Sequence, residues 1–339
     1  MGAQMLKTRD PVFDIIKGFL IVMVIVGHTY MGKLSSLVFS FHMPLFFIIA
    51  GYFFKPRNFF AELTVDFKRL LLPCFFSSLV IIVISCFLYV FFDENTVLER
   101  VLSVLWGGGI KTRTLYFGCR LWSGPIWFLY AMFCARILLN YVIKIKNRAL
   151  AMGVTIVLSI IAINLRFYID VPFSVLPAIC AVTFMLMGYL IKENDLLHGK
   201  NRLFPWTIIC WLAMISLNGN MDMNICNYVG FFVLYLLGAL GAFFVIYSFV
   251  NSVKEREGNA TFEKILALLG KYCLIVFSVH SIEFMYLQDF WHWMIRYFRI
   301  IFGSFAEITT FSLRLSLILF LTYGISKIDI LKKNIFGIE

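Results

Sequence analysis

The stretch from Phe13 to Tyr30, FDIIKGFLIVMVIVGHTY, is an apolar run that contains two misplaced polar side chains, Lys17 and His28. Eleven positions separate these two residues. On a helix that is about three turns, or about 16 Å along the axis, so both side chains lie on nearly the same face. Because an ionisable residue inside a membrane span is costly and usually lines a functional pathway, the pair indicates a site within the bilayer.

The whole chain has the composition of a membrane protein. Of its 339 residues, 61% are hydrophobic and 14% are charged, whereas soluble proteins have about 25% charged residues. Apolar runs near membrane-spanning length recur from end to end. We therefore predict an all-α polytopic membrane protein in which residues 1–339 form one integral-membrane domain. No small-residue cleavage motif follows the first run, which favours a retained helix over a signal peptide.

The net charge of +11 does not require a nucleic-acid partner, because the cytoplasmic loops of membrane proteins are rich in Lys and Arg. We expect the lipid bilayer as the surrounding partner and no nucleic acid. Eighteen loop Lys and Arg residues lie on the side of both termini and eight on the other side, which predicts cytoplasmic termini. The bundle is expected to have about ten transmembrane helices: 13–30, 37–54, 70–92, 123–141, 149–165, 172–191, 203–218, 226–250, 268–287 and 300–323.

The predicted orientation of each span gives the depth of its residues in the membrane. Polar and aromatic side chains from several spans are expected to gather in the outer half of the membrane, around His28. Basic side chains are expected nearer the cytoplasm, where Lys17 lies. The outer group is His28, His42, Trp127, Arg166, His280 and Glu283, and the inner group is Lys17, Lys68, Arg69 and Arg136.

Simpler interpretations of these residues stay open at this stage. A histidine within a membrane is often a hydrogen-bond anchor between helices, and a tryptophan often belongs to the interfacial aromatic belt. Lys17 could only neutralise Asp14, three residues earlier, and Lys68 and Arg69 could be ordinary cytoplasmic charges. Glu283 needs a cation, for which Arg166 and Arg296 are candidates. Arg314, in the middle of the last span, is expected to face a polar interior.

Metal and hydrolase chemistry have little support in the sequence. The spacing of the histidines matches no compact zinc motif, and the eight cysteines contain no CxxC pair. We therefore expect no metal and no disulfide framework. No GxSxG or P-loop motif is present, so neither a serine hydrolase nor a nucleotide hydrolase is indicated.

Five motifs follow one another in an order that resembles a known family. They are DIIKG (14–18) with VGH (26–28), FHMPLFFIIAGYF (41–53), KRLLLP (68–73), GPIWFL (124–129) and LGKYCL (269–274), which leads to His280. Together they resemble the integral-membrane acyltransferase-3 family, in which a Lys or Arg, ten intervening residues and a His form the diagnostic motif. Lys17 and His28 match that motif. The second block most resembles the fucose 4-O-acetylase-like branch, with Ala50 where Ser is commoner.

The resemblance implies an O-acyltransferase of the bacterial inner membrane that uses acyl-coenzyme A, most often acetyl-CoA, as the acyl donor. The acceptor is then a hydroxyl of an envelope sugar or polysaccharide. His28 is the expected general base or acyl-accepting nucleophile, with His280 and Glu283 as catalytic neighbours. Lys17, Lys68, Arg69 and Arg136 are expected to bind the acyl-CoA, and His42, Trp127 and Arg166 the sugar.

Two other classes of function also fit the residues. A transporter or flippase for a glycan or small molecule would have many spans and buried ionisable residues. Against it, the sequence shows no repeated halves, and its polar residues gather toward one face of the membrane. A non-catalytic membrane subunit that positions a partner enzyme is the third class. The acceptor, the acyl group and assembly into a homo-oligomer stay open.

Overall fold

The computed structural model describes residues 10–29, 31–89, 95–197, 204–216, 221–228, 232–255 and 260–338. These residues form helices joined by loops and turns, with two isolated β-bridges and no strand among them. The all-α prediction is therefore confirmed. The fourteen α-helices are α1 (Pro11–Gly27), α2 (Lys33–Phe39), α3 (His42–Tyr52), α4 (Phe59–Asp66), α5 (Leu72–Tyr89), α6 (Asn95–Trp106), α7 (Trp127–Val142), α8 (Arg148–Leu165), α9 (Val175–Glu193), α10 (Phe204–Ser216), α11 (Phe232–Glu255), α12 (Ala260–Lys271), α13 (Cys273–Phe302) and α14 (Ala306–Ser326).

Seven helical stretches among the described residues are long and apolar enough to cross a membrane. The last of them, Cys273–Ser326, contains both α13 and α14. Helices α1 and α10 coincide with predicted spans but have only 17 and 13 residues. The number of ten spans and the cytoplasmic termini therefore stay predictions, while the multi-pass membrane character is established.

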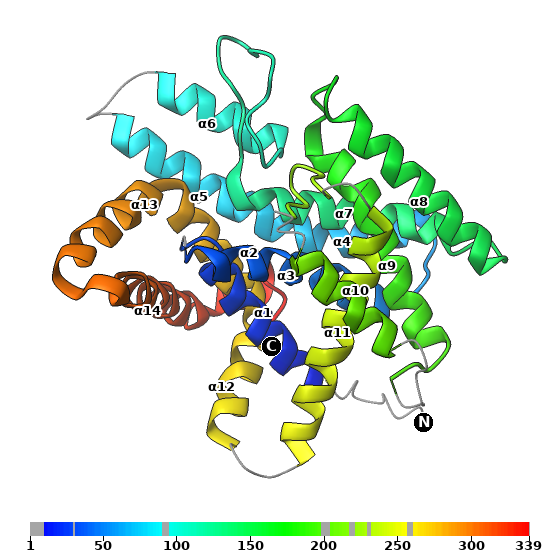
Figure 1. The fold of residues 1–339 in the computed structure, drawn as a ribbon. Coiled ribbons are helices and arrows are strands. Elements are labelled where there is room, and N and C mark those ends of the chain that lie inside the picture. Colours follow the sequence, from blue (N-terminus) through cyan, green and yellow to red (C-terminus); the bar gives the residue numbers. More distant parts are fainter. Residues whose placement is uncertain are drawn as a thin grey trace, which may run out of the picture.

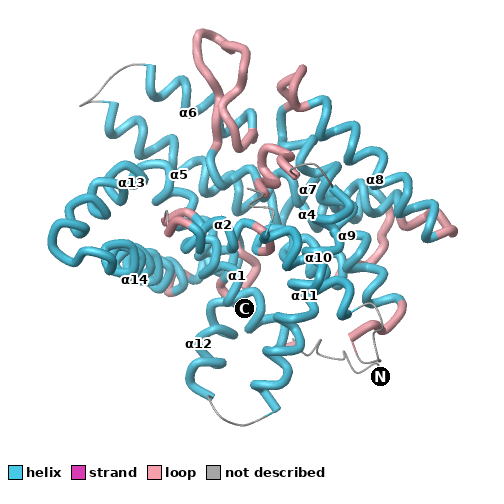
Figure 2. The backbone as a smooth tube through the Cα atoms, in the orientation of Figure 1, coloured by secondary structure: helices cyan, strands magenta, loops and turns pink. Residues whose placement is uncertain are grey.

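Four short helices, α2, α4, α6 and α12, were not predicted as separate elements. Helix α6 is the amphipathic part of the loop expected at 93–122, and α12 precedes α13. Figure 1 shows α6 and the loop after it at the top of the view, and α12 at the bottom. In Figure 2 the loops after α6 and α8 gather at this upper end of the bundle.

Helix α13 continues well past the predicted end of its span at residue 287, to Phe302. Asp289, His292 and Arg296 lower the local hydropathy, but neither Pro nor Gly interrupts the helix between Cys273 and Phe302. Helix α13 then turns back into α14 through Gly303–Phe305, with Gly303 at φ +55°, a conformation that favours glycine. The two helices pack against each other on one side of the bundle (Figure 1).

The basic entry to α5 is a π-helical turn, Phe67–Leu71, which joins α4 to α5. Pro73 follows it and has no N–H to donate, so a regular α-helix would leave a carbonyl without its partner there. In the wider turn the Leu72 N–H instead bonds to the Phe67 carbonyl, five residues earlier. Lys68 and Arg69 are exposed on this turn.

Glycines let α1 approach the helices around it closely. A Cβ atom built on Gly18 of α1 would lie 1.9 Å from the Leu266 carbonyl oxygen of α12, and one on Gly270 would lie 1.8 Å from the Asp14 carbonyl oxygen. Such contacts exclude any side chain at either position. Small residues at a helix crossing are the usual means of close packing between membrane helices.

We predict that Gly18→Ala destabilises the protein by about 1–3 kcal/mol, because the added methyl group forces α1 and α12 apart. Thermal unfolding of the detergent-solubilised chain measures this. Gly153→Ala in α8 is the matched control, since its Cβ would meet nothing within 4 Å. Equal midpoints for the two variants would contradict the packing argument.

Candidate active site

Three side chains predicted to share one layer are in direct contact. His28 follows the last residue of α1, and His280 and Glu283 lie one turn apart on α13. The His28 Nδ1 atom lies 3.2 Å from His280 Nε2, and His280 Nδ1 lies 3.0 Å from Glu283 Oε2. The sequence placed these residues at similar depth, and the structure joins them into one hydrogen-bonded row.

Arg314 of α14 supports the carboxylate end of this row. Its Nη2 donates to Glu283 Oε2 at 3.0 Å, and its Nε forms an ion pair with Oε1 at 3.0 Å. The Trp291 indole N–H also donates to Oε1. Glu283 therefore takes its cation from Arg314, not from the Arg166 or Arg296 considered in the sequence analysis.

The same arginine holds the end of α1. Its Nη1 donates to the His28 carbonyl oxygen at 2.6 Å, and the Gln288 Nε2 donates to that oxygen at 3.3 Å. The last carbonyls of a helix lack intrahelical donors and carry partial negative charge, so a cation placed there is favourable. Arg314 thus fixes the main chain of His28 and, through Glu283, the neighbour of its side chain.

The contacts determine which nitrogen of His28 carries the proton in the neutral ring. Its Nδ1 lies 2.9 Å from the Val24 carbonyl oxygen, which can only accept a hydrogen bond. The proton is therefore on Nδ1, and the lone pair is on Nε2. Nε2 has no hydrogen-bond partner among the described residues.

His28 differs from the other three side chains of the site in its solvent exposure. His280 and Arg314 have no exposed surface and Glu283 is 4% exposed, whereas His28 is only partly buried. The Phe39 and Phe284 rings stand edge-on to the His28 imidazole, with centroids 5.8 and 4.9 Å away. Within this row, His28 is therefore the side chain that a substrate can reach.

Comparison with known proteins identifies the family. The model of the acyltransferase domain family, acyltransferase-3, matches residues 10–327, nearly the whole chain. The chain belongs to this family. No curated protein and no solved structure matches the chain. An acyltransferase on many apolar helices is a multi-pass membrane enzyme, as the sequence analysis predicted at that level.

Two residues expected to bind sugar lie behind other side chains in the acyltransferase. His42 is 1% exposed, its Nδ1 lies 2.7 Å from the Val38 carbonyl oxygen, and the Phe39 ring separates it from His28. Trp127 is 7% exposed, and its Cδ1 would lie 2.6 Å from a Cβ added to Gly109. Neither side chain is open to a ligand in this conformation.

The basic residues expected to bind acyl-CoA fall into two environments. Lys17 Nζ forms an ion pair with Asp14 Oδ1 at 2.5 Å and is partly exposed, and Lys68 and Arg69 are exposed. Arg136 is buried instead, where its Nη2 and Nε bond to Glu62 Oε1 and Asp66 Oδ2, both at 2.8 Å. The structure thus pairs Arg136 with two carboxylates inside the bundle.

The face of α1 between Lys17 and His28 is packed with apolar side chains. Leu20 and Ile25 have no exposed surface, and Ile21 and Val24 are 1% and 2% exposed. An interior packed at this density has no room for a threaded ligand unless side chains move. Helix geometry could predict that Lys17 and His28 lie on one face of α1. It could not predict that neighbouring helices pack against that face.

Several residues of the site carried no usable signal in the sequence. Gln288 and Trp291 lie beyond the predicted end of their span, so they had no assigned depth. Phe284 and Trp122 are ordinary aromatic residues in an aromatic-rich chain, yet the Phe284 ring contacts His28, and the centroid of the Trp122 ring lies 6.0 Å from that of Phe284. For Arg314, the sequence showed a cation in the middle of an apolar span but did not indicate which residue it pairs with.

We predict that Arg314→Leu destabilises the acyltransferase by about 3–5 kcal/mol, because it leaves the Glu283 carboxylate buried without its cation. The double variant Arg314→Leu/Glu283→Leu removes both charges and should regain a substantial part of that loss. Chemical unfolding in detergent measures both variants. A double variant less stable than the single one by the full cost of Glu283→Leu would contradict this.

Proposed function

We propose that this acyltransferase moves an acetyl group, or another short acyl group, from acyl-CoA to a hydroxyl of an envelope sugar or polysaccharide. The observation that carries the proposal is the partly exposed His28 side chain, in which the bonds of Nδ1 leave the lone pair of Nε2 available. A neutral imidazole with this arrangement is suited to act as a general base.

In the proposed reaction the sugar hydroxyl gives its proton to His28 Nε2 as its oxygen attacks the thioester carbonyl. The carbon–sulfur bond then breaks, and the thiolate of coenzyme A takes the proton from the imidazolium. The products are the sugar ester and the free thiol. Attack by Nε2 itself on the thioester, giving an acyl-His28 intermediate, uses the same lone pair and is the second route.

Two acceptors and a helix end near His28 would partly stabilise the imidazolium that forms during transfer. Nδ1–H faces two acceptors, the Val24 carbonyl oxygen and the His280 Nε2 atom. The imidazole also stands at the C-terminus of α1, where helix carbonyls carry partial negative charge. Glu283 holds Nδ1–H of His280 and so keeps its Nε2 lone pair directed at His28, as in other hydrogen-bonded catalytic rows.

We place the donor on the side of the basic π-turn. Lys68 and Arg69 are exposed there and suited to bind phosphates of the acyl-CoA nucleotide, and Lys17 lies on the α1 face that leads to His28. Because the side chains along that face are packed, we infer that entry of the acyl arm requires them to move. Arg136 is buried and paired with internal carboxylates, whereas Lys68 and Arg69 are exposed, so Arg136 is the less accessible phosphate ligand.

The proposed topology follows the loop charges. Both termini and the donor side then face the cytoplasm of a bacterium, the protein lies in its inner membrane, and the sugar arrives from outside. The motif from Phe41 to Phe53 supports a place in the fucose 4-O-acetylase-like branch. Family membership favours this enzyme over a transporter or a non-catalytic subunit.

We predict that His28→Ala lowers the rate of acyl transfer by about 10²–10⁴-fold, the usual contribution of a general base, while the chain still folds. The measurement is transfer of labelled acetyl from acetyl-CoA to envelope glycans by the purified protein. His292→Ala, a histidine of α13 outside the row, is the control and should keep full activity. A fully active His28→Ala protein would exclude both chemical routes.

We also predict that the double variant Lys68→Ala/Arg69→Ala raises the KM for acetyl-CoA and changes kcat little, because these residues bind a remote part of the donor. Lys146→Ala, an exposed lysine after α7, is the control for a lost positive charge. An unchanged KM for acetyl-CoA in the double variant would move the donor site elsewhere.

A further inference from the structure

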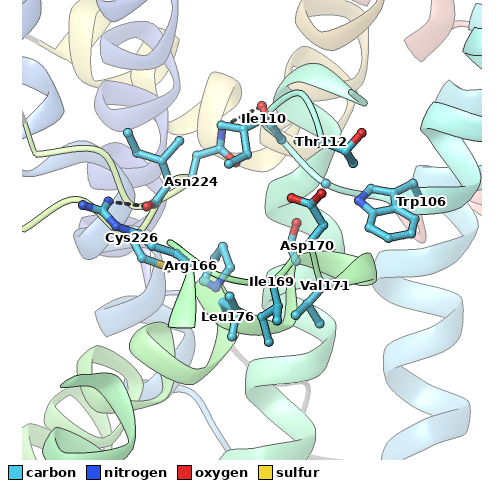
Figure 3. A pocket seen from close by; sticks show the side chains of 15 residues that line it. Trp106, Ile110, Thr112, Arg166, Ile169, Asp170, Val171, Leu176, Asn224 and Cys226 are labelled. Atoms are coloured by element: carbon cyan, nitrogen blue, oxygen red, sulfur yellow. Dashed lines mark hydrogen bonds between the residues drawn. The ribbon is translucent and has the colours of Figure 1, made fainter. Parts of the chain in front are cut away.

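Three loops surround a hollow that contains Arg166, a residue that the sequence analysis expected to bind sugar. The residues that line it come from the stretches 106–112, 166–177 and 224–226. Figure 3 shows Trp106 and Thr112 on one side, Arg166 and Asn224 opposite, and Asp170 between them. The walls combine an aromatic ring with several side-chain and main-chain polar groups, the usual composition of a site for a small polar ligand.

The hollow shares a wall with the candidate active site. The Gly109 carbonyl oxygen accepts from Asn224 Nδ2 at 2.8 Å and from Trp122 Nε1 at 2.7 Å. Asn224 lines the hollow, whereas the Trp122 ring packs against Phe284, which packs against His28. A ligand in the hollow is therefore separated from the His28 region by one stretch of main chain and two aromatic rings.

Some residues in the loops around the hollow have an energetically unfavourable backbone conformation. Phe173, Ser174 and Cys226 have φ between +50° and +56°, although none of them is glycine. Ser174 is held by a 2.6 Å bond to the Gly107 carbonyl oxygen. Strained main chain that the surroundings hold in place concentrates at ligand-binding sites.

Two buried polar atoms of residues that line the hollow also have no hydrogen-bond partner among the described residues. The buried Arg166 Nε and Asn224 Oδ1 atoms have no partner among them, while Arg166 Nη1 donates to the Ile225 carbonyl oxygen. Buried polar atoms without partners are rare in folded proteins and call for an explanation. Both atoms are covered here, so a ligand would reach them after small shifts of their side chains.

The charges around the hollow favour a neutral ligand. Among the residues that line the hollow, Arg166 supplies one positive charge and Asp170 one negative charge. Asp170 Oδ2 already accepts from the main-chain N–H groups of Arg113 and Thr114. An acidic sugar would meet at least as much negative as positive charge.

We propose that the hollow is an acceptor subsite, which holds one edge of a neutral pyranose next to the unit that receives the acyl group. This proposal rests on the proposed function. The half-open space of about 50 Å³ holds a few water molecules, so it accepts the hydroxyl-bearing edge of a ring, while the rest of the ring lies outside it. Planar polar groups and an aromatic face suit such a ring.

The test fills the hollow without removing a hydrogen bond. Ile110 lines it and is 44% exposed, so Ile110→Trp should block it. Leu115→Trp, on the same loop but outside the hollow and 60% exposed, is the matched control. Binding of methyl α-glycosides of glucose, mannose, galactose and fucose to the full chain in nanodiscs is measured by saturation-transfer NMR.

We expect at least one glycoside to bind the wild type and Leu115→Trp alike, and to bind Ile110→Trp about tenfold more weakly, a difference of about 1.4 kcal/mol. Binding of no glycoside to the wild type, or equal binding to all three proteins, would overturn the proposal. Binding does not depend on catalysis. A wild type that binds glycosides in the hollow but transfers no acyl group would refute the proposed function and leave the subsite standing.

Discussion

The buried ion pair between Arg314 and Glu283 is the interaction on which the site depends. It joins α14 to α13, and the same guanidinium holds the carbonyl of His28 at the end of α1. Two charges inside a membrane bundle are tolerated because each has its partner and further hydrogen bonds, whereas removing either one leaves the other unpaired. The pair therefore fixes three helices at the point where the imidazole must be aimed.

Close helix packing and chemistry are coupled through α1. Its glycine crossing with α12 fixes one end of the helix, and the Arg314 contact fixes the other. The C-terminus placed in this way offers partial negative charge to His28, and its Val24 carbonyl oxygen accepts a hydrogen bond from Nδ1–H. Because the end of α1 places a carbonyl oxygen beside Nδ1, the proton is on Nδ1 and the lone pair is on Nε2. The main chain at the end of the helix thus gives His28 the protonation that a general base needs.

Much of this could be predicted from the sequence, and the limit is physical. Hydropathy located the long helices, because lipid requires apolar surface, and helix geometry placed Lys17 and His28 on one face. Depth then grouped His280 and Glu283 with His28. Contacts across helices could not be predicted in this way, since depth says nothing about which faces meet. Arg314 was therefore expected to face a polar interior but not to pair with Glu283, and the internal pairing of Arg136 was missed.

The central claim is that His28, through its free Nε2, is the reacting imidazole and His280 its buried support. Carbethoxylation with diethyl pyrocarbonate attacks neutral, accessible imidazole nitrogens, and peptide mass mapping of the purified chain locates each modified histidine. The account predicts that acyl transfer is lost in step with modification of His28 while His280, with none of its surface exposed, stays unmodified. Full transfer activity in protein whose His28 is completely modified would contradict it.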